Sequence, residues 1–185
     1  MGYRNQIVLE RDPNDFYREP EWVTEELLTV ERFGGFCWDP AKGSDTIPYV
    51  LTCAGIDARG TDIAEGANFC FLTGHSYSAE NIISNPPFSL AVPFVQRALK
   101  SSRHKVAFFL RLNFLESQAR NALLTNTPLA RVWVFSNRVP IAKGMDPFPK
   151  HGGMESYAWF VWEHGWRGPP QLGWLLHREG RQGEE

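Results

Sequence analysis

Short apolar runs alternate with helix-like stretches along most of this chain, and this alternation strongly limits the folds that it can adopt. The clearest run follows Lys105, where five consecutive apolar residues end at Leu110. Continuous runs of this kind are typical of strands that are buried on both faces of a parallel sheet. Strands that alternate with helices favour right-handed crossovers between them. We therefore predict an α/β fold with a mostly parallel central sheet and helices on both faces.

The periodicity and the turn residues predict the individual elements. Helices are expected at 22–30, 46–54, 93–99 and 116–124, and strands at 36–38, 56–61, 81–84, 105–110, 131–135 and 157–162. The last strand is expected to close the sheet, and the glycine- and proline-rich stretch 140–153 to form a loop. Residues 1–20 are expected to be an N-terminal arm and residues 178–185 a flexible charged tail, so that 21–177 form the domain.

Length and composition limit the possible functions. The 185 residues fit a single domain, and the net charge of -2 provides no general attraction to a polyanion. Contact with nucleic acid would therefore need a local basic patch. Cys37, Cys53 and Cys70 are too far apart for a zinc site or a disulfide framework, and we expect reduced, mostly buried thiols and no metal. Without a membrane-length apolar run or a signal-like N-terminus, a cytoplasmic protein is expected.

Polar residues follow the first three predicted strands of the sheet. Asp39 follows the first strand, Asp62 the second and Asn85 the third. In open α/β sheets, ligands bind outside the carboxyl ends of the strands. Gly43 would let the backbone approach a ligand closely, and the helix after it offers free amides. Taken singly, Asp39 could also be a helix cap and Asp62 a turn former.

The turn Asn85-Pro86-Pro87-Phe88 is the most informative stretch. The two prolines fix the backbone and remove two donors, so the turn presents mainly hydrogen-bond acceptors. The Asn85 amide oxygen can accept from an amine, and the Phe88 ring can stack on a planar group. We therefore expect a site for an exocyclic amino group. A strand-ending turn with an aromatic residue of the core is the structural alternative.

In combination, these motifs resemble those of the class I S-adenosylmethionine-dependent amino-methyltransferases, especially small phage and prophage N6-adenine DNA methyltransferases. The resemblance extends from about residue 15 to residue 174 and is most specific at residues 82–88. It implies a Rossmann-like class I methyltransferase fold with S-adenosylmethionine as cofactor. The cofactor-binding residues that it implies are Tyr17, Pro20, Asp39, Pro40, Ala41, Gly43, Asp62 and Asn85. The catalytic residues that it implies are Asn85, Pro86, Pro87 and Phe88.

The resemblance also implies a mechanism, in which a methyl group is transferred directly to the exocyclic amine of a flipped base, adenine N6 of DNA. The carbonyls of Asn85 and Pro86 would accept hydrogen bonds from the amine, and Phe88 would stack on the base. No covalent enzyme intermediate is needed. Nucleic acid is therefore the expected substrate. Because the chain has no room for a target-recognition region, sequence choice would come from loops such as 140–153 or from a protein partner.

Two other functions remain open. The same chemistry could act on an amine of RNA or on the amide of a protein glutamine. Alternatively, the chain could be a degenerate methyltransferase fold that serves as a binding module or subunit. Asp45 and Cys70 favour this last function, because they stand where the family has a second loop glycine and an acidic residue for the cofactor's adenine. Glu19 is a further departure, since a threonine is common before Pro20.

Overall fold

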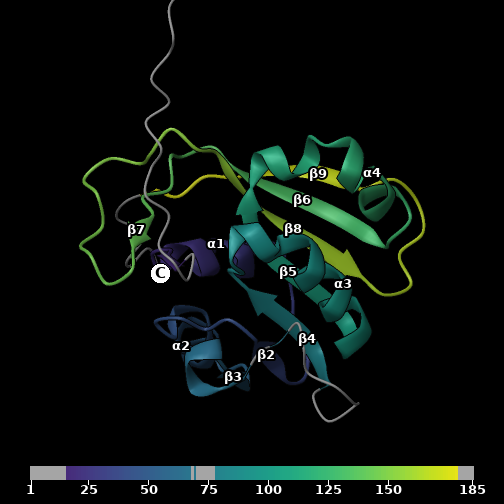
Figure 1. The fold of residues 1–185 in the computed structure, drawn as a ribbon, viewed down its shortest axis with the longest axis horizontal. Coiled ribbons are helices and arrows are strands. Elements are labelled where there is room, and N and C mark those ends of the chain that lie inside the picture. Colours follow the sequence, from purple (N-terminus) through teal and green to yellow (C-terminus); the bar gives the residue numbers. More distant parts are fainter. Residues whose placement is uncertain (1–15, 68, 70–77, 179–185) are drawn as a thin grey trace, which may run out of the picture.

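The computed structural model describes residues 16–67, 69 and 78–178. Within them, a seven-stranded sheet has the strand order β3-β2-β4-β5-β8-β6-β9 (Figure 1). Its strands are β2 (Cys37–Asp39), β3 (Ala58–Gly60), β4 (Ala79–Ser84), β5 (Ser102–Arg111), β6 (Leu129–Phe135), β8 (Tyr157–Glu163) and β9 (Gln171–Leu175). Among these strands, β8 alone runs antiparallel to its neighbours. The predicted mostly parallel sheet is confirmed.

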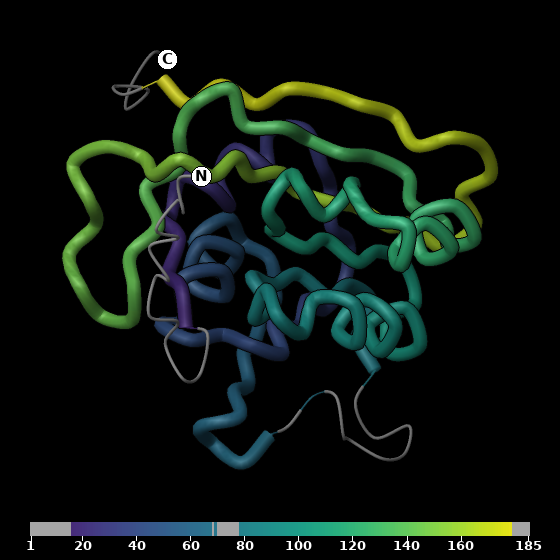
Figure 2. The backbone as a smooth tube through the Cα atoms, turned by 45° about the horizontal axis from the view of Figure 1, so that its top comes forward, coloured from purple at the N-terminus to yellow at the C-terminus, as the bar shows by residue number. Residues whose placement is uncertain are grey.

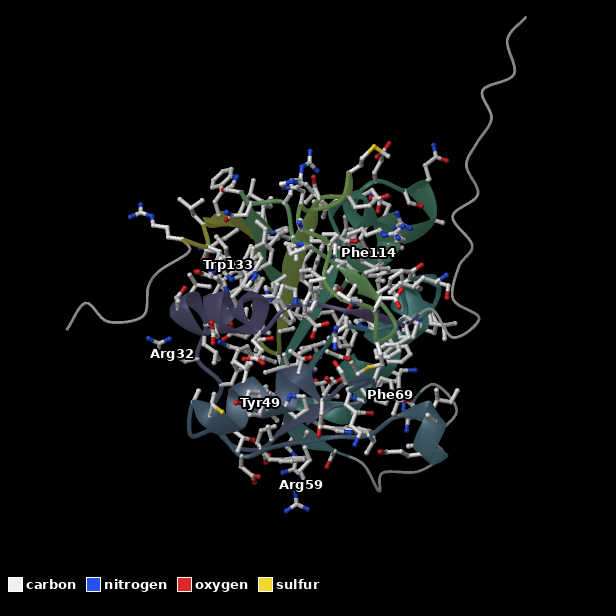
Figure 3. The ribbon with its side chains drawn as sticks, turned by 90° about the vertical axis from the view of Figure 1, so that its left-hand side faces the viewer. Arg32, Tyr49, Arg59, Phe69, Phe114 and Trp133 are labelled. Carbon is white, nitrogen blue, oxygen red and sulfur yellow. The ribbon has the colours of Figure 1, made fainter. Side chains whose placement is uncertain are left out.

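Helices cover both faces of this sheet, as predicted (Figure 1). One face carries α1 (Trp22–Val30) and α2 (Thr46–Cys53), and the other carries α3 (Ala91–Ser101) and α4 (Gln118–Thr125). Figure 3 separates the two sides: Trp133 and Tyr49 lie on the side of α1 and α2, and Phe69 and Phe114 lie on the opposite side. The sheet is therefore the middle of three layers.

The continuous apolar runs serve both cores because neighbouring side chains of a strand point to opposite faces. In β5, Phe108 packs in the core under α3, whereas Phe109 packs in the core under α1 and α2. In β8, Phe160 and Trp159 divide in the same way. All four side chains are fully buried. This arrangement is the physical reason that the sequence shows runs rather than polar–apolar alternation.

The C-terminal part of the sheet differs from the prediction. The strand predicted at 157–162 does not close the sheet, because β8 lies between β5 and β6. The sheet continues beyond β6 with β9, which the sequence did not reveal. The glycine at position 173 interrupts the apolar pattern of β9, and a Cβ there would lie 2.1 Å from the Trp133 ring. Gly173 is therefore a packing requirement of the sheet rather than a turn signal.

A separate two-stranded sheet joins the first described residues to the long loop before β8. β1 (Tyr17–Arg18) pairs antiparallel with β7 (Ala142–Lys143). Figure 2 shows this first segment, in purple, beside the green loop that carries β7. The predicted loop 140–153 therefore contains a short strand. We call residues 16–20 the strap; residues 1–15 of the predicted arm and 179–185 of the predicted tail lie outside the described residues.

The cysteines differ from the prediction at one position. Cys37 is buried, but Cys53 at the end of α2 is exposed, so the prediction of mostly buried thiols is wrong for Cys53. Cys70 lies outside the described residues. In the described part of the chain, no cluster of histidine, cysteine and acidic side chains could hold a metal ion. None of the helices described there has the length and apolar character needed to cross a membrane.

A buried carboxylate joins the end of α1 to the amino ends of β5 and β6. Glu31 is 3% exposed and accepts hydrogen bonds from Lys105 Nζ at 2.8 Å, from Trp133 Nε1 at 2.9 Å and from the Arg131 guanidinium. Burial alone would raise the pKa of Glu31, but these three donors outweigh it and the pKa is lowered. Arg131 also pairs with Glu163 of β8. The cluster thus connects one helix with three strands.

We predict that Glu31→Ala lowers the free energy of unfolding by about 3–5 kcal/mol, because Lys105 and Arg131 lose their shared buried partner. Chemical denaturation measures this change. The matched control is Glu25→Ala on the exposed side of the same helix, which should cost less than about 1 kcal/mol. Since the pKa of Glu31 is lowered on folding, its contribution should be lost as the pH falls below the ordinary value of 4.5. Equal effects of the two substitutions would contradict the prediction.

Candidate functional site

The carboxyl ends of β2, β3 and β4 bring the predicted polar residues to one edge of the sheet. β2 pairs in parallel with β3 on one side and with β4 on the other. Asp39 at the end of β2 therefore lies between the segments that carry Asp62 and Asn85. The Ser84 hydroxyl donates to Asp39 Oδ1 at 2.7 Å, and the Thr61 amide donates to the Asp39 carbonyl at 2.8 Å. These bonds join the ends of all three strands.

The Asp39 side chain is buried and connects the turn after β2 to the end of β4, so it does not act as a helix cap. Its side chain is 2% exposed and accepts from the Ser84 hydroxyl and, at 3.0 Å, from the Ala41 amide. Burial raises the pKa of Asp39 to about 7, against the effect of these two hydrogen bonds. Pro40, which is also buried, and Ala41 follow in the same turn. The buried carboxyl group of Asp39 thus holds the turn in place from the protein interior, and the backbone of the turn forms its outer surface.

The turn after β2 depends on left-handed backbone at two positions. Gly43 has φ 49°, and a Cβ there would lie 2.6 Å from the Phe16 ring. Asp45 has φ 66°, which aspartate adopts more readily than most other residues. It immediately precedes α2 and makes no side-chain capping bond to it. Asp45 therefore keeps the backbone shape of a glycine position and adds a negative charge beside the free amides of the helix.

Asp62 organises the turn after β3. Its Oδ2 accepts from the Gly43 amide at 3.1 Å, and its Oδ1 accepts from the Ala64 amide at 2.9 Å, at the start of the 3-10 helix η1 (Ile63–Glu65). Asp62 therefore does form a turn, which was the structural alternative that its sequence position suggested. Each carboxylate oxygen has a second lone pair, so Asp62 can still accept from hydroxyl groups of a ligand.

The side-chain amide of Asn85 is held by the strap. Its Nδ2 donates to the Tyr17 carbonyl at 2.7 Å and to Glu19 Oε2 at 2.6 Å. Both amide hydrogens are used, and the described residues place no donor against Oδ1. Pro86 is buried, and the carbonyl of Pro87 accepts from the Leu90 amide in the 3-10 helix η3 (Phe88–Leu90). Asn85 therefore presents a fixed acceptor oxygen.

The ring of Phe88 is half-buried and has neighbours from three segments. Tyr17 of the strap stacks on it, with centroids 5.7 Å apart and planes 22° apart. The Arg111 guanidinium lies 4.8 Å from its centroid, and Tyr157 lies at 5.9 Å. Phe88 also packs against both apolar cores. A planar ligand that stacks on Phe88 must therefore share the ring with these side chains.

Two arginines that the sequence analysis missed line a cavity beside Phe88. The cavity has a volume of about 140 Å³ and lies between the start of α3, the end of β5 and the 3-10 helix η4 (Leu112–Leu115). Arg111 Nε is buried and has no acceptor in the described part of the chain. Arg120 holds the carbonyls of Asn113, Phe114 and Glu116. The signal available in the sequence was Arg111, which directly follows the strongly apolar run 105–110 and therefore had to lie at the carboxyl end of that strand.

The remaining predicted residues lie in the strap. Tyr17 contributes its ring to Phe88 and its carbonyl to Asn85. The carbonyl of Pro20 accepts from the Val23 amide at 3.0 Å and thereby begins α1. The structure therefore places the predicted cofactor-binding and catalytic residues in two adjoining groups, one around Asp39 and one around Asn85.

No family model matches the sequence of this chain, and no curated protein matches it. Solved structures with a similar fold include a modification subunit of a putative type I restriction enzyme from Vibrio vulnificus. It is 14% identical, with 90% of this chain and 48% of that chain covered and a TM-score of 0.57. This chain therefore spans about half the length of that subunit.

Two further structures have the same fold. One is a predicted O-methyltransferase from Agrobacterium tumefaciens, with 11% identity, coverage of 89% of this chain and 90% of that chain, and a TM-score of 0.56. The other is a dimethyladenosine transferase from Plasmodium falciparum, with 11% identity, coverage of 78% and 62%, and a TM-score of 0.51. The chain therefore has the Rossmann-like fold of these methyltransferases, as its sequence predicts.

We predict that Asp39 makes the stability of the protein depend on pH. Its pKa is about 7 in the folded state, above the ordinary value of 3.8, so folding favours the protonated form. This contribution is fully present below pH 3.8 and is lost as the pH rises through 7, at up to about 1.4 kcal/mol per pH unit. Asp39→Asn should remove this slope from denaturation curves measured between pH 4 and 9. Parallel curves for the two proteins would contradict the prediction.

Proposed function

We propose that this protein is an S-adenosylmethionine-dependent methyltransferase that acts on an exocyclic amine, with adenine N6 of DNA as its acceptor. The main support is the Asn85 amide, whose hydrogens are both held by the strap while Oδ1 has no donor among the described residues. The fold, which is that of several methyltransferases, supports the class of reaction.

The residues of the first group fit S-adenosylmethionine. Asp62 can accept from the two ribose hydroxyls, and the uncapped start of α2 can donate amides to a carboxylate. The close packing of Gly43 on Phe16 leaves no room for a side chain, so the backbone itself forms this side of the proposed cofactor site. We assign Tyr17 and Pro20 to the methionine part, as the family resemblance implies. When bound, the cofactor supplies an electrophilic methyl group.

The second group supplies the acceptor chemistry. An exocyclic amine on an aromatic ring is a poor nucleophile, because its lone pair is delocalised into the ring. Asn85 Oδ1 and the Pro86 carbonyl accept hydrogen bonds from its two N–H groups. These bonds favour a pyramidal nitrogen and stabilise the positive charge that develops on it. Phe88 holds the plane of the base. A base within a duplex cannot reach this turn, so it must be flipped out of the helix.

The cavity beside Phe88 favours nucleic acid over a protein glutamine as the acceptor. Arg111, whose Nε is buried without an acceptor among the described residues, and Arg120 bring two guanidinium groups to this cavity, although Arg111 Nη1 also lies 3.9 Å from Glu155 Oε1. Such a surface suits a polyanion. The first structural neighbour is described as a modification subunit of a restriction enzyme, and this supports DNA as the substrate and a partner protein that supplies target recognition.

A second candidate function is a binding module that has lost transfer activity. Asp45 favours it, because its carboxylate stands at the start of α2, where the cofactor's own carboxylate would bind. Calorimetric titration with S-adenosylmethionine separates the two candidates. No detectable binding at millimolar cofactor would exclude the enzyme and leave the binding module.

We predict that Asn85→Ala lowers methyl transfer by about 10²-fold or more, because one of two acceptors for the amine is lost. Cofactor affinity should change little. Transfer of a labelled methyl group, offered DNA, RNA and protein in parallel, measures the rate and identifies the acceptor. Asn121→Ala removes the same side chain from the exposed surface of α4 and should leave the rate unchanged. Unchanged turnover in Asn85→Ala would refute the role of that residue.

We predict that Asp45→Asn tightens cofactor binding about fivefold, since roughly 1 kcal/mol of repulsion between two exposed carboxylates is removed. Calorimetry measures the dissociation constant. Asp57→Asn, at an exposed position before β3, is the control and should have no effect. Weaker binding in Asp45→Asn would mean that the carboxylate contributes to the site instead of opposing the cofactor.

A further inference from the structure

Glu19 is a buried acidic residue that the proposed mechanism does not use. It lies in the strap between β1 and α1, and it is 5% exposed. Among the described residues, it takes part in no ion pair. Its Oε2 accepts from Asn85 Nδ2 at 2.6 Å. Burial of a carboxyl group without a cation is unfavourable, so this contact needs a reason.

The amide of Asn85 can in principle adopt two orientations, which exchange its oxygen and its nitrogen. In the observed one, its two hydrogens meet the Tyr17 carbonyl and the Glu19 carboxyl group. In the other, both hydrogen bonds are lost, and the amide oxygen faces two acceptor oxygens. The Tyr17 carbonyl alone opposes this flip with one hydrogen bond. Glu19 adds the second and holds the amide at both hydrogens.

We infer that Glu19 is a positioning residue for the acceptor, which fixes the Asn85 amide so that the site presents an oxygen rather than an NH2 group. This inference rests on the proposed function and deepens it. With this orientation, the site accepts a substrate that carries N–H donors. With the reverse orientation, it would repel an amine and favour a carbonyl or a ring nitrogen. Glu19 therefore selects amines as the class of substrate.

The protonation state of Glu19 should control this selection. Burial raises the pKa of Glu19 to about 8; the hydrogen bond from Asn85 and the charge of Arg18 act in the opposite direction, and Asp39 raises the pKa further. The carboxylate can only accept, so it holds a single amide orientation. The protonated acid carries an O–H donor, which can also satisfy the reversed amide. Transfer should therefore become faster as the pH rises through about 8.

The test compares Glu19→Gln with Glu21→Gln, which changes an exposed carboxylate two residues further along the chain. The rate of labelled-methyl transfer is measured from pH 6 to 9.5 under saturating cofactor. Wild type and Glu21→Gln should show a rise centred near pH 8, of about tenfold. Glu19→Gln keeps the shape of the side chain but should lose this rise, and Glu19→Ala should lower kcat about tenfold without weakening cofactor binding. A Glu19→Gln profile that still rises near pH 8 would overturn the inference.

A second measurement does not require turnover. The two side-chain amide protons of Asn85 can be followed by ¹⁵N NMR, and Asn85→Asp identifies their signals. In wild type, these signals should shift with pH near 8, and in Glu19→Gln they should not. Signals that do not respond in wild type contradict the role of Glu19. Signals that respond in a protein that methylates no acceptor instead contradict the proposed function.

Discussion

The parallel pairing of β2 with β4 is the constraint on which the candidate site depends. The two strands are adjacent although their paired residues lie 44 positions apart in the chain, with Cys37 opposite Asn81 and Trp38 opposite Ile82. The hydrogen bond from Ser84 to Asp39 then locks the two strand ends together. A methyl donor and its acceptor react only when they are held in line at close range. One buried bond thus sets the distance between the turn after β2, to which we assign the cofactor, and the turn after β4, to which we assign the amine.

Helix α1 connects this edge of the sheet with the opposite one. It begins at Trp22, shortly after the strap, and its C-cap is Glu31 in the ion cluster at the amino ends of β5 and β6. Between them, Leu27 is fully buried, and the carbonyl of Val23 accepts from Trp159 Nε1 at 2.9 Å. Because α1 is fixed at both ends and along its length, the strap can hold Asn85 against a rigid support. The ion cluster around Glu31 at one edge of the sheet therefore helps to fix the position of Asn85 at the other edge.

Local patterns in the sequence were enough to predict the helices, most strands and the order of Asp39, Asp62 and Asn85 along one edge. Each of these depends on residues close together in the chain. The insertion of β8 between β5 and β6 depends on pairings across the whole C-terminal half, which no local period contains. The contact between Glu19 and Asn85 spans 66 residues, and nothing in either segment specifies the other. The partners of Glu31 could not be predicted either, because they also lie far from it in the chain.

The charges of the site divide it into two parts. Around the turn after β2 lie Asp45 and Asp62, whereas Arg111 and Arg120 line the cavity beyond Phe88. In the proposed reaction, the cofactor carries a positive sulfonium and the acceptor is a polyanion. The acidic part attracts the sulfonium and repels the polyanion, whereas the basic part attracts the polyanion and repels the sulfonium. In that reaction, each reactant would be guided to its own side of Asn85, with the neutral amide oxygen between them. Under the proposed function, Asp45 would repel the carboxylate of the cofactor, and it would also add to the negative charge that keeps the polyanion away from the turn after β2.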